Sequence, residues 1–214
     1  MLVNDARAFS APNSYQQWLH RLHTLAPQVQ ALLAAMGSQV NGTACVYLMD
    51  SKSIPVCAPI RDGRVRLLRV DGVYFGKTSK GWFFGFKLQL IRDLTVRILN
   101  VVLTPSNWTD HDAALALGFN VVGGVGIADL GYRGAATQVI LWEEADLLLL
   151  TKDDVAAPQR FLLSQLRQGV ETTFSQLWLA LIDRVGACSW HGLWNTMMLK
   201  LLPFQWTQTW RLTA

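Results

Sequence analysis

The sequence is poor in cysteine and in charge, and each shortage excludes a class of protein. Among its 214 residues are three cysteines, Cys45, Cys57 and Cys188, and no pair has CxxC spacing. This set favours neither a disulfide-stabilised scaffold nor a zinc finger, and it indicates a reduced, cytosolic protein. Only 16% of the residues are charged and 51% are hydrophobic, which excludes a disordered chain and predicts a compact fold.

Long apolar segments are also missing. The apolar run at residues 145–150 is short and contains Asp146, so it is unsuited to crossing a bilayer. Met1–Ser10 carries Asp5 and Arg7 and has no apolar core, so no signal peptide is expected. We therefore predict that the protein has no membrane partner.

What the sequence does have is a modest excess of positive charge, much of it in one segment. The formal net charge is +4, which favours a polyanionic partner. Between residues 52 and 80, Asp62 and Asp71 are the only acids. The basic residues of this segment are Lys52, Arg61, Arg64, Arg66, Arg69, Lys77 and Lys80.

The chain divides into a short helical appendage and one main domain. Residues 14–36 place apolar side chains at helical spacing. Pro27 is expected to split this stretch into two short helices, and Gly37 to end the second. We assign residues 1–42 to the appendage and residues 43–214 to the main domain, because a chain of this length can bury one substantial core.

The first half of the main domain reads as three strands. Residues 45–51 form an apolar run typical of a buried strand, and residues 52–80, rich in proline and glycine, are expected to be irregular. A strand at 82–90 and another at 97–104 flank a turn near 93–95, which predicts an antiparallel hairpin. Alternation places Phe84, Phe86, Leu88 and Leu90 on one face of the first hairpin strand, and Phe83, Gly85, Lys87 and Gln89 on the other.

Helices and strands then alternate. The order β-β-β-α-β-α-β-α predicts an α/β fold, a mixed sheet flanked by helices. Residues 190–210 are expected to form a helix interrupted at Pro203, followed by a tail. The remaining predicted elements are a helix at 110–117 capped by Thr109 or Asp110, a strand ending at Asp129, a helix at 134–144, a strand at 146–151 and a long helix at 157–182.

Three acidic residues are the strongest functional signal. Asp50 and Asp129 each close an apolar strand, and Glu171 lies in the long helical stretch. A carboxylate at the end of a buried strand is costly unless it is paired or binds a cation, so the three predict a divalent-metal site. The alternative is structural: Asp50 and Asp129 cap turns, and Glu171 pairs with Arg167 one helical turn away.

Three motifs in order carry a family resemblance. They are Tyr47–Lys52 with Pro55, Ala128–Gly134, and Arg167–Ser175 containing Glu171. The chain resembles the DDE-type transposases of bacterial insertion sequences, whose catalytic domain has the ribonuclease-H-like fold. It departs from the family's Tyr-xx-Arg-xxx-Glu-xxxxxx-Lys signature at Ser164 and Trp178, and its N-terminal region is shorter than in such transposases.

The resemblance implies a function and its cofactors. Asp50, Asp129 and Glu171 are expected to hold two Mg²⁺ or Mn²⁺ ions, with Asp50 bridging both, and to catalyse DNA strand cleavage and strand transfer. Double-stranded DNA, as transposon ends and target, is the expected partner of a homo-oligomer in the bacterial cytoplasm at the nucleoid. Two alternatives stay open: a truncated, non-catalytic remnant that binds DNA or a full-length transposase, and a ribonuclease-H-like nuclease.

Basic residues near these motifs are candidates for phosphate contacts, which position DNA without reading its sequence. Tyr132 and Arg133 directly follow Asp129, so we expect them to contact the strand being cut by stacking or by phosphate pairing. Arg167 is expected to orient Glu171 or to bind a phosphate. The full set of predicted DNA-binding residues is Lys52, Arg64, Arg66, Lys77, Lys80, Lys87, Tyr132, Arg133 and Arg167.

Overall fold

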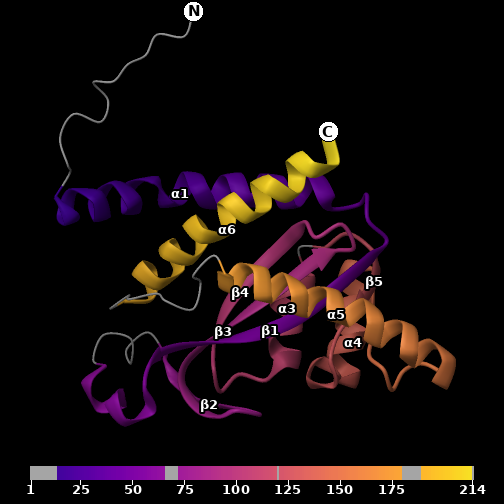
Figure 1. Ribbon diagram of the computed structural model, residues 1–214. Helices are drawn as coiled ribbons and strands as arrows, with labels where there is room; N and C mark the ends of the chain where they lie inside the picture. Colours follow the sequence, from indigo (N-terminus) through magenta and orange to yellow (C-terminus); the bar gives the residue numbers. More distant parts are fainter. Residues whose placement is uncertain (1–13, 66–71, 120, 180–188, 214) are drawn as a thin grey trace, which may run out of the picture.

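The computed structural model describes residues 14–65, 72–119, 121–179 and 189–213 (Figure 1). Arg66, Cys188 and the last residues of the helix expected at 157–182 lie outside this part. The elements are, in chain order, α1 (Tyr15–Val40), β1 (Val46–Cys57), the 3-10 helix η2 (Pro59–Arg64), β2 (Tyr74–Thr78), β3 (Gly81–Asp93), β4 (Ile98–Pro105), α3 (Asp110–Gly118), β5 (Gly124–Ile127), the 3-10 helix η3 (Leu130–Tyr132), α4 (Ala135–Ala145), β6 (Leu147–Leu150), α5 (Ala157–Leu179) and α6 (Trp190–Thr213).

All six strands of the described chain join one mixed sheet. The strand order is β2-β3-β1-β5-β6, and β4 also pairs with β3. Strand β3 pairs antiparallel with β1, β2 and β4, whereas β5 pairs parallel with β1 and with β6. The central order β4-β3-β1-β5-β6 is that of the ribonuclease-H-like fold, so the predicted fold class is confirmed.

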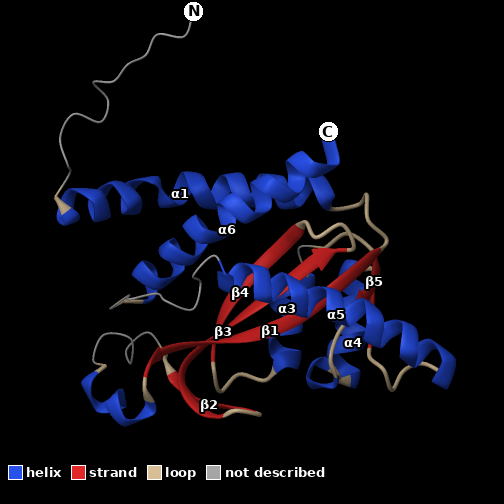
Figure 2. Ribbon diagram, in the orientation of Figure 1, coloured by secondary structure: helices blue, strands red, loops and turns tan. Residues whose placement is uncertain are grey.

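Helices cover both faces of the sheet and create two apolar cores (Figure 2). One core joins side chains of β1, β3 and β4 to α5 and α6, among them Leu48, Val170 and Met197. The other joins β1, β3 and β6 to α3 and α4, among them Met49 and Leu117.

The alternation predicted for β3 is confirmed. Phe84, Phe86, Leu88 and Leu90 are all buried in the core under α5 and α6. The opposite face of the strand carries polar side chains, and Gln89 is buried there with hydrogen bonds to Thr104 and Asp110. One strand therefore builds a hydrophobic core on one side and a polar cluster on the other.

The prediction that prolines interrupt the terminal helices is wrong. Pro27 lies inside α1 and Pro203 inside α6, and both helices continue past them. A proline removes one intrahelical hydrogen bond, and here packing between α1 and α6 offsets that loss. Gly37 does not end α1 either: a Cβ there would lie 2.3 Å from the carbonyl oxygen of Leu99, so glycine permits the helix to cross β4 closely.

The segment expected to be irregular contains regular structure. Strand β1 continues to Cys57, η2 follows, and β2 adds a strand that sequence analysis did not predict. Pro55 is tolerated within β1 because the register shifts between Pro55 and Cys57, which is where sheets accept proline. Gly85 is opposite, and a Cβ there would lie 2.1 Å from the carbonyl oxygen of Ile54.

Within the described residues, none of the helices has the length and apolar content that crossing a bilayer requires.

Gln205 of α6 completes the hydrogen bonding at the start of β4. Its Oε1 accepts from the backbone N–H of Ile98 at 2.8 Å, and its Nε2 donates to the Ile98 carbonyl at 3.0 Å. Both residues are buried. We expect Gln205→Ala to lower the free energy of unfolding by about 2–4 kcal/mol, because it creates a cavity and leaves two buried backbone groups unpaired.

Urea unfolding followed by circular dichroism measures this loss. Gln208→Ala, three residues further along the same helix, is the control and is expected to change stability by less than about 0.5 kcal/mol. Equal stabilities for the two variants contradict a structural role for the Gln205–Ile98 pair.

Candidate active site

The register of the sheet brings the two aspartates to the same level. Leu48 of β1 is paired with Ile127 of β5, and Asp50 and Asp129 each follow two residues later. Residues two apart on an extended chain point to the same face. Both aspartates therefore face the side of the sheet covered by α5, the helix that carries Glu171.

Helix α5 lies close to the sheet because of a glycine beside the glutamate. A Cβ on Gly169 would come within 2.5 Å of Nη2 of Arg92, an arginine of β3 that is 3% exposed. Arg92 donates from Nη1 to the backbone oxygen of Asp93 at 2.8 Å, which holds its side chain under the helix. Val170, directly before Glu171, is fully buried in the same core.

The charges of Asp129 and Glu171 both act on the carboxylate of Asp50. The pKa of Asp50 is raised to about 6, chiefly by burial, and the charges of Asp129 and Glu171 raise it further. A hydrogen bond from the Ser51 backbone and the guanidinium of Arg167 act in the opposite direction and lower the pKa. The site thus concentrates negative charge that this chain neutralises only in part.

Arg167 pairs across the site. Its Nη1 lies 3.2 Å from Oδ1 of Asp129, so the pair joins α5 to the end of β5. The expectation that Arg167 forms an intrahelical pair with Glu171 is replaced by this contact. Nε of Arg167 is buried without a hydrogen-bond partner. One arginine therefore provides the main positive charge among the three carboxylates.

The two aspartates also form the local turn contacts expected of the structural alternative. Oδ1 of Asp50 accepts from the Ser51 backbone N–H at 2.8 Å, and Oδ1 of Asp129 accepts from the Leu130 backbone N–H at 2.8 Å. Asp129 is the N-cap of η3. These contacts orient each carboxylate and use only one acceptor position of each group.

The donor set fits a hard divalent cation. Carboxylate oxygens are the ligands that Mg²⁺ and Mn²⁺ prefer, and three carboxylates contribute negative charge to this site. In the part of the chain that the structure describes, no three His, Cys, Asp or Glu side chains already stand at metal-ligand spacing. Binding of one cation by all three carboxylates therefore requires their side chains to converge.

A groove of about 690 Å³ opens next to the carboxylates. Its walls come from β1 after Asp50, the β2–β3 turn, the first residue of α3 and the second half of α5. Polar and apolar side chains contribute in similar measure, including Ser175 and Trp178 of α5. The predicted DNA-binding residues that line it are Lys52, Lys77, Lys80 and Lys87.

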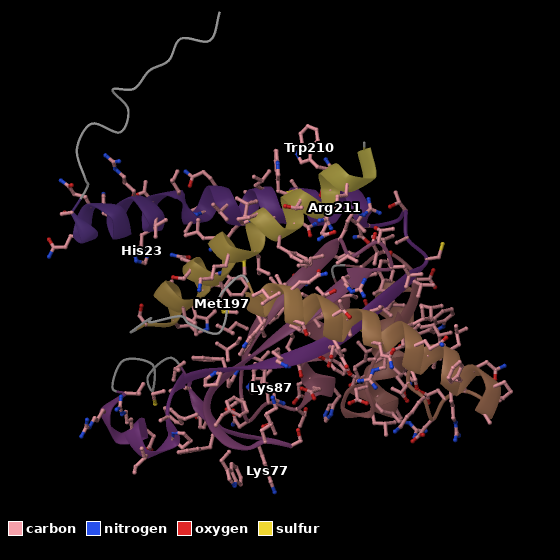
Figure 3. All side chains as sticks on the ribbon, in the orientation of Figure 1. His23, Lys77, Lys87, Met197, Trp210 and Arg211 are labelled. Carbon is pink, nitrogen blue, oxygen red and sulfur yellow. The ribbon has the colours of Figure 1, made fainter. Side chains whose placement is uncertain are left out.

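The four lysines are held in different ways. Lys52 lies over the ring of Trp178 at 5.6 Å from its centroid, and Lys77 lies over Trp82 at 5.8 Å. Lys87 is engaged in an ion pair with Asp110 at 3.0 Å. Figure 3 shows Lys77 extending outward from β2, and Lys87 nearer the middle of the sheet.

Other predicted DNA-binding residues lie elsewhere. Arg133 pairs with Asp153 and Asp154, each at 3.5 Å, and Arg64 is exposed at the end of η2 and does not line the groove. Tyr132 is 1% exposed, so the expected stacking on DNA does not fit it. Its ring fills the core under α3 and α4, and its hydroxyl donates to Gln89.

A polar cluster beside the site was missed by sequence analysis. It joins Tyr132, Gln89, Asp110 and Lys87 through side-chain hydrogen bonds. The pKa of the Tyr132 hydroxyl is raised well above its usual value, first by burial and then by the charge of Asp110, so it remains a donor. The available signal was the polar face of β3, where lysine and glutamine alternate with apolar residues.

Comparison with known proteins assigns a family. A model of the transposase DDE domain matches residues 40–178, which include all three carboxylates. The chain belongs to the DDE transposase family. It is also similar to the crystal structure of the catalytic domain of Mos1 mariner transposase, with 12% identity over 92% of this chain and 93% of that one, and a TM-score of 0.31. A search of curated proteins found no match.

Burial of Asp50 makes the stability of this transposase domain depend on pH. Its folded pKa of about 6 exceeds the ordinary value of 3.8, so the folded state binds the proton more tightly and loses stability as pH rises between these values. Without metal, we expect Asp50→Asn to be more stable than the wild type above pH 6 by up to about 3 kcal/mol. Below pH 4 the difference should vanish.

Urea unfolding in the presence of a chelator, at a series of pH values, measures the difference. Glu144→Gln removes an exposed carboxylate of α4 and serves as the control, with less than about 0.5 kcal/mol expected. A constant difference between Asp50→Asn and the wild type at every pH contradicts the assignment.

Proposed function

We propose that this chain catalyses divalent-metal-dependent cleavage and strand transfer of double-stranded DNA through Asp50, Asp129 and Glu171. The observation that carries the proposal is the common level of Asp50 and Asp129 on adjacent parallel strands, beneath the helix of Glu171. The charges of Asp129 and Glu171, which both raise the pKa of Asp50, support it. Family membership supplies the reaction class, phosphoryl transfer on DNA.

The three carboxylates would hold Mg²⁺ or Mn²⁺, and two such ions would activate the attacking oxygen and stabilise the leaving one. The chain's own residues orient this site. Ser51 and Leu130 fix one oxygen of each aspartate through their backbone N–H groups. Arg167 pairs with Asp129 and acts on Asp50, and its guanidinium would be placed to bind the phosphate of the scissile bond.

The lysine-lined groove is the proposed path of the DNA backbone. It begins at Ser51 and Lys52, directly after Asp50, and extends to the β2–β3 turn with Lys77 and Lys80. Several cations along one groove attract phosphates and release counterions. Trp178 adds an aromatic wall, which holds Lys52 in place. We further propose that the protein acts as a homo-oligomer on the paired ends of a bacterial insertion sequence, at the nucleoid DNA of the cytoplasm.

Nicking of supercoiled plasmid in Mg²⁺ or Mn²⁺ tests the triad. We expect Asp50→Asn, Asp129→Asn and Glu171→Gln each to reduce the rate by at least about 100-fold, because each removes a charged metal ligand. Glu144→Gln is the matched control and keeps the wild-type rate. The triad assignment fails if any of the three variants nicks DNA at the wild-type rate.

The same assay separates the alternatives. Joining of the cleaved 3′ end to a target identifies a transposase, whereas cleavage without joining identifies a ribonuclease-H-like nuclease. A folded wild type that binds DNA and neither nicks nor joins it identifies a non-catalytic remnant.

Salt dependence of DNA binding tests the groove. We expect Lys52→Met and Lys80→Met each to weaken duplex binding and to reduce the slope of log K against log salt by about 0.9, because each removes one phosphate contact. Fluorescence anisotropy between about 50 and 200 mM salt measures it. Lys152→Met, an exposed lysine outside the groove, is the control. Slopes unchanged in both groove variants contradict this path.

A further inference from the structure

Asp110 is the first residue of helix α3. The N-cap of α3 is Thr109, whose side chain accepts from the Asp112 backbone N–H, so Asp110 is not used for capping. Its carboxylate instead faces the sheet. Oδ1 accepts from Nζ of Lys87 at 3.0 Å, from Nε2 of Gln89 at 3.3 Å and from Oγ of Ser51 at 3.5 Å.

The second oxygen of Asp110 lies against the turn that follows Asp129. A Cβ on Gly131 would come within 2.8 Å of Oδ2 of Asp110, so a larger residue there would force this carboxylate to move. Tyr132, the next residue, donates its hydroxyl to Gln89, which itself donates to Asp110. Asp110 thus packs against the turn after the second catalytic aspartate.

One side chain therefore touches both segments that carry the candidate ligands. Ser51 directly follows Asp50, and Gly131 follows Asp129 by two residues. Ser51 is paired with Gln89 across β1 and β3, whereas Asp50 is paired with Leu90, whose side chain lies in the core under α5. Because neighbouring strand residues point to opposite faces, Asp110 supports the two aspartates from the reverse side of the sheet.

We propose that Asp110 is a positioning residue of the metal site: it joins the side chain of Ser51, which follows Asp50, to the turn after Asp129 and keeps the two carboxylates in register for a divalent cation. This inference rests on the proposed function. Groups that orient metal ligands without touching the metal commonly change its affinity by about 10–100-fold when they are replaced. The three ligands do not already stand at ligand spacing, so their support decides how readily they converge.

The contact with Lys87 gives Asp110 a second consequence. Lys87 was predicted to bind a phosphate, yet its ammonium also donates to the carbonyl of Trp108 at 3.0 Å and is held between that oxygen and Asp110. Both members of the ion pair are largely buried, with side-chain exposures of 19% and 25%. Asp110 therefore holds this cation at the groove wall and compensates its charge.

Isothermal titration of the full chain with Mn²⁺, without DNA, tests the proposal independently of activity. Asp110→Asn keeps the shape of the side chain and removes its charge. We expect it to weaken Mn²⁺ binding by about 10–100-fold and to raise the Mn²⁺ concentration for half-maximal nicking by the same factor. Asp112→Asn, on the same helical turn but exposed, should bind Mn²⁺ as the wild type does.

A second variant perturbs Asp110 sterically and leaves every charge unchanged. Gly131→Ala introduces the Cβ that collides with Oδ2 of Asp110, and we expect it to weaken Mn²⁺ binding by about tenfold. In an Asp110→Ala background the collision is gone, so the added methyl should weaken binding by less than about twofold. This coupling is not expected from a residue that contributes to folding alone, and it remains measurable if Asp110→Asn folds poorly.

The outcomes are distinct. The positioning role is overturned if folded Asp110→Asn and Gly131→Ala both bind Mn²⁺ within twofold of the wild type. It is also overturned if the effects of Gly131→Ala and Asp110→Ala simply add. Failure of the proposed function looks different: the wild type itself then neither binds Mn²⁺ nor nicks DNA, and both proposals fall together.

Discussion

The parallel pairing of β1 with β5 is the constraint on which the rest of the site depends. A shift of one residue in this register would turn Asp129 to the opposite face from Asp50, because side chains alternate along a strand. Glycine enables the pairing: Gly124 has φ +110°, and a Cβ there would lie 2.9 Å from the carbonyl oxygen of Cys45. The backbone of β5 can therefore approach β1 closely enough to start the ladder where the aspartates end level.

Helix α5 contributes one acidic and one basic side chain to the candidate site. Glu171 and Arg167 stand one helical turn apart, and the close approach at Gly169 brings both to the aspartates. Burial raises the pKa of Asp50, and the charges of the other two acids add to this effect. The charge of Arg167, which also pairs with Asp129, lowers the pKa of Asp50 and offsets part of this effect. Among the described residues, Arg167 is therefore the basic side chain that pairs within this acidic cluster, and the proposed divalent cation would add further positive charge.

The sheet separates two kinds of chemistry by face. On the side of α5, Asp50 and Asp129 lie beside a hydrophobic core. On the reverse side, Gln89 and Tyr132 belong to a buried polar cluster in which each donor has an acceptor. A fully satisfied buried cluster is rigid, because every displaced group loses a hydrogen bond that water cannot replace. The proposed metal site is therefore supported from the reverse side of the sheet by a rigid cluster.

Much of this protein follows from local patterns in the sequence. The strand alternation from Phe83 to Leu90, the order of helices and strands, and the strand-end acids are short-range signals that predicted the fold class and led to Asp50, Asp129 and Glu171. The continuity of α1 through Pro27 and the added strand β2 depended on packing between distant segments, which local propensity does not contain. Long-range packing also determines what each basic residue contacts. Local sequence marks Lys52, Lys87 and Arg133 alike as cations, and only the tertiary structure places the first beside Trp178, the second against Asp110 and the third against Asp153 and Asp154. The sequence determines that each of these residues carries a positive charge, whereas the tertiary structure determines which group each one contacts.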